Sequence, residues 1–404
     1  MKNGNPIAEN IPLNEPLIAF IKTHEQEDGV KLLLKAKQFP TINIPFAVQQ
    51  IEARKKAKLK MPSWWGNRSI IWPVKVSMEQ ASSELTAQYK ASLLKGKSCA
   101  DLTGGLGVDT FYLSQNFEQS VYYELNDALC RIAKYNFNEL GAKNIEVKQG
   151  NGVEMVTQNS QEFDLIYLDP SRRDTSKQKV FKLENCTPNL LEIIEALQAK
   201  GTTVMAKLSP MLDLKQTIQQ FPSLNEIHIV SVENDCKEVL LIFKKENSSP
   251  LIINSVALNK EGSSVSETFP VLPSTHHEFN WSSPKEILYE PDVALMKAGV
   301  IGGFHHIANR YQLDKLHPNS HLFTSDLLIE NFLGRVFKVE KIVIFKKNEL
   351  KQLDIKKANI TARNFPLTVD EIRKKTKWKE GGELYIFATT LLNGQKVLLL
   401  CAKL

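Results

Sequence analysis

Hydrophobic and polar positions follow two different rhythms in the first half of the 404-residue chain. Residues 45–60 (PFAVQQIEARKKAKLK) mix apolar and basic positions as a helix does, and Pro62 ends the pattern. Residues 77–94 are rich in Ala, Leu, Gln and Glu, which favours further helix. The first ninety or so residues are therefore predicted to be mainly helical.

From Lys97 onward, short apolar runs alternate with helical stretches that end at glycines such as Gly141 and Gly201. Repeated strand and helix units of this kind predict a parallel, doubly wound sheet. Two strands separated by the polar Asn-Asp-Cys, residues 226–233 and 237–245, predict a hairpin that closes the sheet. The other expected strands are 98–103, 120–124, 144–149, 163–169 and 202–208, and the expected helices are 108–116, 127–141 and 187–201.

The alternation is lost after residue 248. Residues 251–270 are interpreted as a strand followed by a Ser-rich loop, and residues 289–304 as a turn leading into a helix. Near the end, Asn393-Gly394 between two apolar runs predicts a terminal hairpin in a small α+β domain. The domains expected from these changes are an N-terminal helical region (1–78), a sheet domain (79–248), a linker strand with a small domain (249–324) and the α+β domain (325–404).

Composition places the chain among globular proteins, with 42% hydrophobic and 24% charged residues. Because no apolar run approaches the length of a bilayer-spanning helix and no signal pattern opens the chain, a cytoplasmic location is expected. The five cysteines form no CxxC pair, which argues against a zinc ribbon or a disulfide framework. The sequence carries no signal for an oligomeric state.

Positive charge gathers in two regions. Residues 331–380 contain 14 Lys and Arg against 6 Asp and Glu, a local balance of +8, whereas the whole chain carries +6. A second cluster in residues 54–60 leads directly into Trp64 and Trp65. Such clusters are typical of contact with a phosphate backbone, although solvated helix faces have the same appearance.

A glycine-rich turn follows the first expected strand, in CADLTGGLGVDT. Asp101 ends the strand, and Gly104, Gly105 and Gly107 let a ligand approach the backbone before a helix begins. A dinucleotide-binding loop or a plain turn has a similar appearance, but the spacing is not GxGxxG and the next strand ends in Glu124, a residue suited to ribose hydroxyls.

Other polar residues follow the neighbouring strands. Asp109 is a candidate partner for the amino-acid part of a ligand, and Asn151, in a GNG sequence, for an adenine edge. The fourth strand ends in Asp169 and Pro170.

The order DLTGGLG, strand-end Glu, GNG and LDPSRR resembles Rossmann-like, class I S-adenosylmethionine-dependent methyltransferases over residues 78–245. The resemblance implies a seven-stranded sheet with an antiparallel last strand and S-adenosylmethionine as cofactor. Asn151 stands where this family often has an acid at the adenine. The cofactor residues implied are Asp101, Thr103, Gly104, Gly105, Gly107, Asp109, Glu124, Asn151 and Asp169.

A narrower resemblance covers the whole chain. EQASSELTAQYKA, DPSRRD, CKEVLL and YEPDVALMKAG together resemble bacterial methyltransferases with a ferredoxin-like insert and a C-terminal THUMP-like domain. Because THUMP domains belong to RNA-modifying enzymes, the resemblance implies tRNA or ribosomal RNA as substrate. The implied fold is a Rossmann-like α/β sheet preceded by helices and followed by a small THUMP-like α+β domain.

The relatives that methylate base amines carry [DN]PP[YF], in which the acid and a proline carbonyl hold the target amine. Asp169 and Pro170 fit this pattern as catalytic residues, whereas Ser171 and Arg172 replace the second proline and the aromatic residue. An exocyclic amine is therefore the favoured acceptor. Trp64 and Trp65 are candidates for stacking on the base, with burial in the core as the alternative.

Arg172 and Arg173 are interpreted as a grip on a substrate phosphate, or as a brace to Asp174 or Glu184. Methylation of carbon 5 of a pyrimidine needs a cysteine nucleophile, and the surroundings of Cys186 lack the pattern of such enzymes.

The pairs His276–His277 and His305–His306 have no acid or cysteine at ligand spacing, so no metal is expected. The remaining alternatives for the whole protein are a methyltransferase for a small molecule or protein, and a non-catalytic RNA-binding module.

Overall fold

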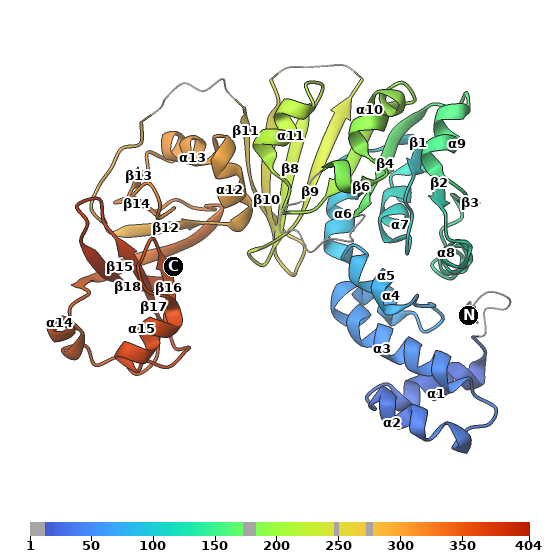
Figure 1. Ribbon diagram of the computed structural model, residues 1–404, viewed down its shortest axis with the longest axis horizontal. Coiled ribbons are helices and arrows are strands. Elements are labelled where there is room, and N and C mark those ends of the chain that lie inside the picture. Colours follow the sequence, from blue (N-terminus) through green and yellow to red (C-terminus); the bar gives the residue numbers. More distant parts are fainter. Residues whose placement is uncertain (1–12, 173–182, 246–249, 272–277) are drawn as a thin grey trace. The chain divides into compact units, whose positions relative to one another are not determined.

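The computed structural model describes residues 13–172, 183–245, 250–271 and 278–404. The chain forms two compact units (Figure 1). One comprises Met1–Leu212, Phe221–Asn225 and Leu240–Asn247, and the other comprises Asp213–Gln220, Glu226–Val239 and Ser248–Leu404. The domain boundaries expected from sequence at 78/79, 248/249 and 324/325 stay predictions.

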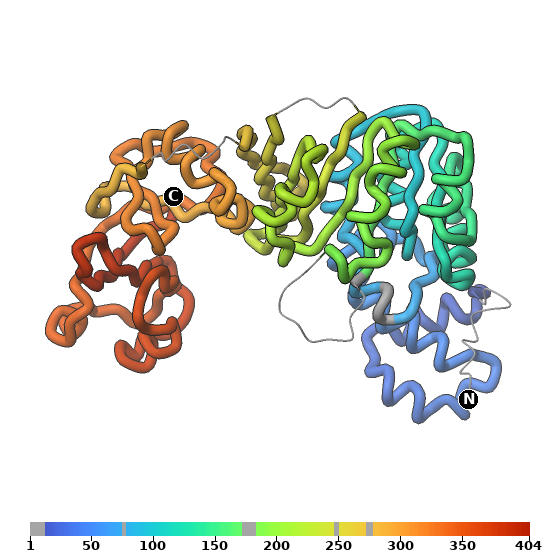
Figure 2. Tube along the Cα trace, turned by 45° about the horizontal axis from the view of Figure 1, so that its top comes forward, coloured from blue at the N-terminus to red at the C-terminus, as the bar shows by residue number. Residues whose placement is uncertain are grey.

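The first unit begins with helices, as the sequence pattern predicts. Helix α3 coincides with the expected helix at 45–60, and its apolar side packs with Leu17 and Leu32 of the preceding helices. Figure 2 shows the chain passing from these blue helices into the cyan and green part of the same unit. The helices are α1 Glu15–His24, α2 Gly29–Leu34, α3 Ile44–Lys60, α4 Pro62–Gly66, α5 Lys75–Gln80 and α6 Glu84–Ser92.

The predicted parallel sheet is confirmed. Strand β1 Gly96–Asp101 pairs in parallel with β2 Phe117–Glu124 and with β4 Phe163–Leu168. The ladder continues in parallel from β2 to β3 Ile145–Gln149 and from β4 to β7 Gly201–Leu208. Helices connect and cover these strands: α7 Val108–Ser114, α8 Asp127–Glu139, α9 Gly152–Gln158 and α10 Leu190–Gln198.

The complete strand order of this sheet is β11-β10-β8-β9-β7-β4-β1-β2-β3. Strands β8 Glu226–Val232 and β9 Asp235–Lys244 are neighbours joined by Glu233 and Asn234, which confirms the predicted hairpin. Helix α11 Leu214–Gln220 precedes β8.

The prediction of a Ser-rich loop after the strand at residue 251 is wrong. Residues Ser264–Pro270 form strand β11, which pairs antiparallel with β10 Ile252–Leu258, and β10 lies parallel to β8. Along β11 the side chains of Glu267 and Phe269 are buried and those of the serines are exposed. The serines therefore belong to the solvent face of a strand, and the sheet extends beyond the seven strands expected.

A second sheet lies in the C-terminal unit, in the order β13-β14-β12-β15-β18-β17-β16. Strands from both sides of the expected boundary at 324/325 hydrogen-bond within it, because β12 pairs with both β14 and β15. The strands are β12 Ile287–Pro291, β13 Asp314–Lys315, β14 Phe323–Ser325, β15 Gly334–Ile344, β16 Asn359–Arg363, β17 Leu384–Thr390 and β18 Lys396–Lys403. The helices are α12 Val293–Ala298, α13 Gly303–Tyr311, α14 Lys347–Lys351 and α15 Val369–Thr376.

The predicted terminal hairpin is confirmed. Strands β17 and β18 pair antiparallel, and Gly394 in the turn between them has φ of +82°. That positive φ explains why glycine follows Asn393. Within the described ranges, no helix combines the length and the apolar character needed to span a membrane.

Candidate active site

The loop between β1 and α7 requires its glycines. Gly107 has φ of +86°, and a Cβ at this position would lie 2.5 Å from the Cζ of Phe137. A Cβ on Gly104 would lie 2.1 Å from the Cε2 of Tyr122. Larger residues would therefore displace the loop from the strand ends, and the predicted approach of a ligand to this backbone stays a prediction.

Asp101 braces this loop from the end of β1. Its Oδ1 accepts a hydrogen bond from the Thr103 N–H at 3.0 Å, and its Oδ2 accepts one from the Thr110 hydroxyl at 2.5 Å. Burial raises the pKa of Asp101 to about 7, and the nearby carboxylates of Asp109 and Asp169 add to the rise. Asp101 is thus a buried carboxyl with partners inside the protein.

Glu124 comes to the same loop from the end of β2. Its Oε2 accepts from the Gly105 N–H at 3.0 Å, and its Oε1 accepts from the Asn126 N–H at 2.8 Å. The structure therefore brings the predicted ribose-binding acid directly beside the glycines. Each carboxylate oxygen has a second lone pair, so these bonds leave it able to accept from a ligand.

Asn151 is the N-cap of α9, a short helix that the sequence pattern did not predict. Its Oδ1 accepts from the Val153 N–H at 3.2 Å, and its Nδ2 donates to Glu154 Oε1 at 2.7 Å. The predicted contact of Asn151 with an adenine stays a prediction, and its side chain already serves the helix end.

Asp169 lies next to the glycine loop. Its backbone N–H donates to Thr103 Oγ1 at 2.6 Å, which joins the end of β4 to the loop after β1. The Asp169 carboxylate is 35% exposed, and its Oδ2 lies 2.5 Å from Lys207 Nζ. Desolvation by the protein raises the pKa of Asp169, while the positive charge of Lys207 opposes that rise.

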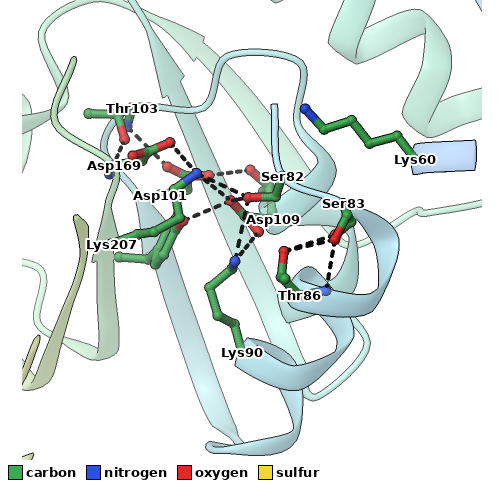
Figure 3. Close-up of polar contacts among 12 residues, drawn as sticks. Lys60, Ser82, Ser83, Thr86, Lys90, Asp101, Thr103, Asp109, Asp169 and Lys207 are labelled. Atoms are coloured by element: carbon green, nitrogen blue, oxygen red, sulfur yellow. Dashed lines mark hydrogen bonds and ion pairs between the residues drawn. The ribbon is translucent and has the colours of Figure 1, made fainter. Parts of the chain in front are cut away.

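A buried charge cluster surrounds Asp109 (Figure 3). Its Oδ2 accepts from the hydroxyls of Ser82 at 2.6 Å and Tyr167 at 2.7 Å. Its Oδ1 lies 3.2 Å from Lys90 Nζ, and Oδ2 lies 3.9 Å from Lys207 Nζ. Burial alone would raise the pKa of Asp109, but the two lysines and the hydroxyl donors hold it below its ordinary value. These contacts tie Asp109 to the interior, and its predicted contact with a ligand stays a prediction.

Four members of this cluster were not among the residues predicted from sequence: Ser82, Lys90, Tyr167 and Lys207. Lys207 stands in TTVMAKL, a strand that is buried from Thr203 to Leu208, and Lys90 is 0% exposed on α6. A lysine inside a buried strand is a usable signal, because a buried ammonium requires a partner. The identity of that partner is not visible in the sequence.

After Pro170 the chain forms the short strand β5 Ser171–Arg172, which pairs antiparallel with β6 Cys186–Thr187. Arg173 and Asp174 lie outside the described residues, so the two interpretations of the arginines remain predictions. Cys186 is 1% exposed.

The tryptophans differ in environment. Trp64 is 0% exposed and packs against Trp72 and Phe111, with ring centroids 6.5 and 5.5 Å away. This burial removes Trp64 as a stacking candidate, because its ring faces are covered by the core. Trp65 is only partly buried, and cations lie over its ring: Arg54 at 5.6 Å, Lys58 at 5.4 Å and Arg68 at 5.3 Å.

The histidine pairs do not assemble a metal site in the described part of the chain. His306 Nε2 lies 2.8 Å from Glu267 Oε2, and His305 stacks on Phe279 with centroids 4.1 Å apart. His276 and His277 lie outside the described residues. No group of three His, Cys, Asp or Glu side chains suited to a metal occurs among the residues that are described.

Nearly the whole chain is similar to a solved structure of comparable length. It is 32% identical to a protein of Porphyromonas gingivalis W83 described as a candidate methyltransferase, with a TM-score of 0.83, over 96% of this chain and 97% of that one. The chain belongs to this methyltransferase family.

Family models match three successive regions of this methyltransferase-family chain. The model described as conserved hypothetical protein 95 matches residues 54–222, which contain the site. A ferredoxin-like domain matches residues 288–332, and a THUMP domain-like model matches residues 334–403. The comparison with curated proteins found no match.

More distant structures resemble parts of this methyltransferase-family chain. The M. capricolum protein TrmK, solved with S-adenosylhomocysteine, is 18% identical, with a TM-score of 0.32, over 42% of this chain and 71% of its own. The Pyrococcus horikoshii protein PH1948, described as a candidate RNA methyltransferase, is 14% identical, with a TM-score of 0.32, over 48% of this chain and 98% of its own.

Proposed function

We propose that this protein is an S-adenosylmethionine-dependent methyltransferase that methylates a base in cytoplasmic tRNA or ribosomal RNA, with an exocyclic amine as the favoured acceptor. The observation that carries the proposal is the 2.6 Å hydrogen bond from the Asp169 N–H to Thr103 Oγ1. It sets the Asp169 carboxylate, which can accept a hydrogen bond from the substrate, beside the glycine loop. Methyl transfer needs this proximity, because the substrate atom that receives the methyl group must approach it in line.

The residues present fit the cofactor. A Cβ on Gly104 would clash with Tyr122 and one on Gly107 with Phe137, so the loop backbone packs closely on the protein there. At Gly105 a Cβ would meet nothing closer than 3.8 Å, which leaves room for a ligand beside the loop. Glu124 lies at its edge and would hold the ribose hydroxyls, and Asn151 would lie near the adenine. When bound, the cofactor supplies the methyl group as a reactive sulfonium.

Asp169 and Pro170 would orient the acceptor. A carboxylate oxygen of Asp169 and the carbonyl of Pro170 accept the two hydrogens of an amine, which directs the nitrogen lone pair toward the methyl group. The partly exposed Trp65 is the remaining candidate for stacking on the base.

Charge and family support an RNA substrate. Residues 331–380 carry the local balance of +8 and lie mostly within the THUMP domain-like match at 334–403. Many lysines of this region are exposed, including Lys338, Lys347, Lys356 and Lys374. A basic surface of this kind binds phosphates and makes affinity salt-dependent.

The test is transfer of tritiated methyl groups to total RNA from a strain that lacks the protein, with RNA from the parent strain as comparison. We expect incorporation only into the deletion RNA, because the parent RNA is already methylated. Asp169→Ala should abolish it, Asp169→Asn should keep part of it through the remaining acceptor oxygen, and Asp235→Ala, an exposed acid, should leave it unchanged.

Two outcomes would contradict the proposal. Cofactor binding without incorporation into any RNA would favour a methyltransferase for a small molecule or protein. Salt-dependent RNA binding without cofactor binding would favour a non-catalytic RNA-binding module.

A further inference from the structure

Lys207 is placed beside Asp169 by the strand register. Strands β4 and β7 pair in parallel with Leu168 opposite Ala206, so the next residue on each strand is Asp169 and Lys207. Their side chains meet at 2.5 Å, between Asp169 Oδ2 and Lys207 Nζ. Lys207 is 8% exposed, so this ion pair forms in a largely desolvated place.

Groups from other elements fix the ammonium of Lys207 on its far side (Figure 3). Lys207 Nζ donates to Ser82 Oγ at 3.1 Å and lies 3.9 Å from Asp109 Oδ2. Ser82 in turn donates to Asp109 at 2.6 Å, and Lys90 neutralises the other oxygen of Asp109 at 3.2 Å. A lysine held by this many partners has lost the rotamer freedom of a surface lysine.

The two carboxylate oxygens of Asp169 differ in their contacts. Oδ2 is engaged by Lys207, whereas Oδ1 has no hydrogen bond or ion pair within the part of the chain that the structure describes. With 35% of its side chain exposed, Asp169 retains an approach for a substrate atom.

We propose that Lys207 is a positioning residue for methyl transfer: it holds Asp169 as a carboxylate in one orientation, so that Oδ1 accepts a hydrogen from the acceptor amine. This inference rests on the proposed function for its substrate. Its structural part, the control of Asp169 by Lys207, stands independently of any RNA.

The groups that face Asp169 explain why a cation is needed there. Asp109 of α7 and Asp101 of β1 are acids close enough to disfavour its charge, and burial acts in the same direction. Lys207 of β7 and, from farther away, Lys90 of α6 favour the charge. Because the direct contact is with Lys207, loss of this lysine would leave Asp169 protonated over a wider pH range. A protonated carboxyl is a poorer acceptor for an amine hydrogen.

The experiment follows the ionisation of Asp169 without any substrate. Protein labelled with ¹³C at the aspartate carboxyl carbons is titrated by NMR, and the Asp169 signal is assigned by its absence in Asp169→Asn. We expect Lys207→Met to raise the titration midpoint of this signal by about 1 pH unit or more, the usual effect of losing an opposite charge in contact. Lys207→Arg should restore most of the original midpoint. Lys237→Met, which removes an equally short but exposed pair with Asp235, should leave it unchanged.

The pH profile of methyl transfer gives the second readout. If Lys207 positions Asp169, the acidic limb of kcat/KM in Lys207→Met moves to higher pH together with the NMR midpoint. An unshifted midpoint would overturn the inference. The inference would also be overturned if Lys207→Met weakened cofactor affinity while the acidic limb of kcat/KM stayed unshifted, because Lys207 would then be a cofactor ligand. A shifted midpoint in a protein that methylates no RNA would refute the proposed function and leave the control of Asp169 standing.

Discussion

The buried pair between Lys90 and Asp109 predicts a large loss of stability when Lys90 is replaced by methionine. Lys90 is 0% exposed, and its ammonium lies 3.2 Å from Asp109 Oδ1. Methionine keeps most of the volume of the lysine stem but removes the charge. The substitution therefore leaves the charge of Asp109 with fewer partners in the interior rather than creating a void.

The magnitude follows from what remains around Asp109. Removal of one partner from a buried ion pair costs about 3 to 5 kcal/mol. Asp109 keeps hydrogen bonds from Ser82 and Tyr167 and the more distant charge of Lys207 at 3.9 Å, so the lower end applies. We expect a loss of about 3 kcal/mol, which corresponds to roughly a 100-fold change in the unfolding equilibrium.

Urea unfolding followed by tryptophan fluorescence measures this loss, because Trp64 and Trp72 are buried in the same unit. Lys56→Met is the matched control: its pair with Glu79 is 2.5 Å long, but the two side chains are 41% and 54% exposed. An exposed pair contributes at most about 1 kcal/mol. If Lys90→Met cost no more than Lys56→Met, the account of the cluster as a set of mutually dependent buried charges would be refuted.

Two further predictions concern other buried acids. Folded Asp101 keeps its proton up to a pKa of about 7, whereas the unfolded chain releases it near 3.8, so this residue lowers the unfolding free energy as pH rises between these values. Asp101→Asn should flatten that decline in urea titrations at several pH values, and parallel declines in the two proteins would contradict the assignment. In the C-terminal unit, the side chain of Glu290 is 1% exposed and accepts hydrogen bonds from both Arg335 and Arg363. Glu290→Gln should cost about 3 kcal/mol in calorimetric unfolding, against at most about 1 kcal/mol for Glu233→Gln, which removes an exposed pair; equal losses would refute this.

Much of the central sheet could be predicted because its signals are local. The apolar run of β4 and the glycine ends of the helices identify strands and helices from neighbouring letters alone. Strand β11 was missed for the opposite reason. Its serines face solvent, and its strand conformation depends on pairing with β10, which no local pattern reveals.

The site divides in the same way. The glycine loop, Glu124 and Asp169 follow strand ends and were predicted together. The hydrogen bond between Ser82 and Lys207 joins residues 125 positions apart. No local sequence motif around either residue predicts the other as its partner. The sequence left two alternatives for Trp64, stacking on a base and burial in the core. The packing around its ring shows that Trp64 is buried in the core.

The placement of Ser82 and Lys90 ahead of β1 has a consequence for how this enzyme fold can be divided. A fragment cut at Gly96, where the sheet begins, would retain the loop, Asp109, Asp169 and Lys207 but lose the hydroxyl and the ammonium that balance them. Such a fragment would lack both the cation that contacts Asp109 and the helix that covers it, so the sheet cannot be cut at Gly96 with the cluster intact. A functional graft or truncation has to begin before Ser82, so that the segment with Ser82 and Lys90 stays together with the sheet.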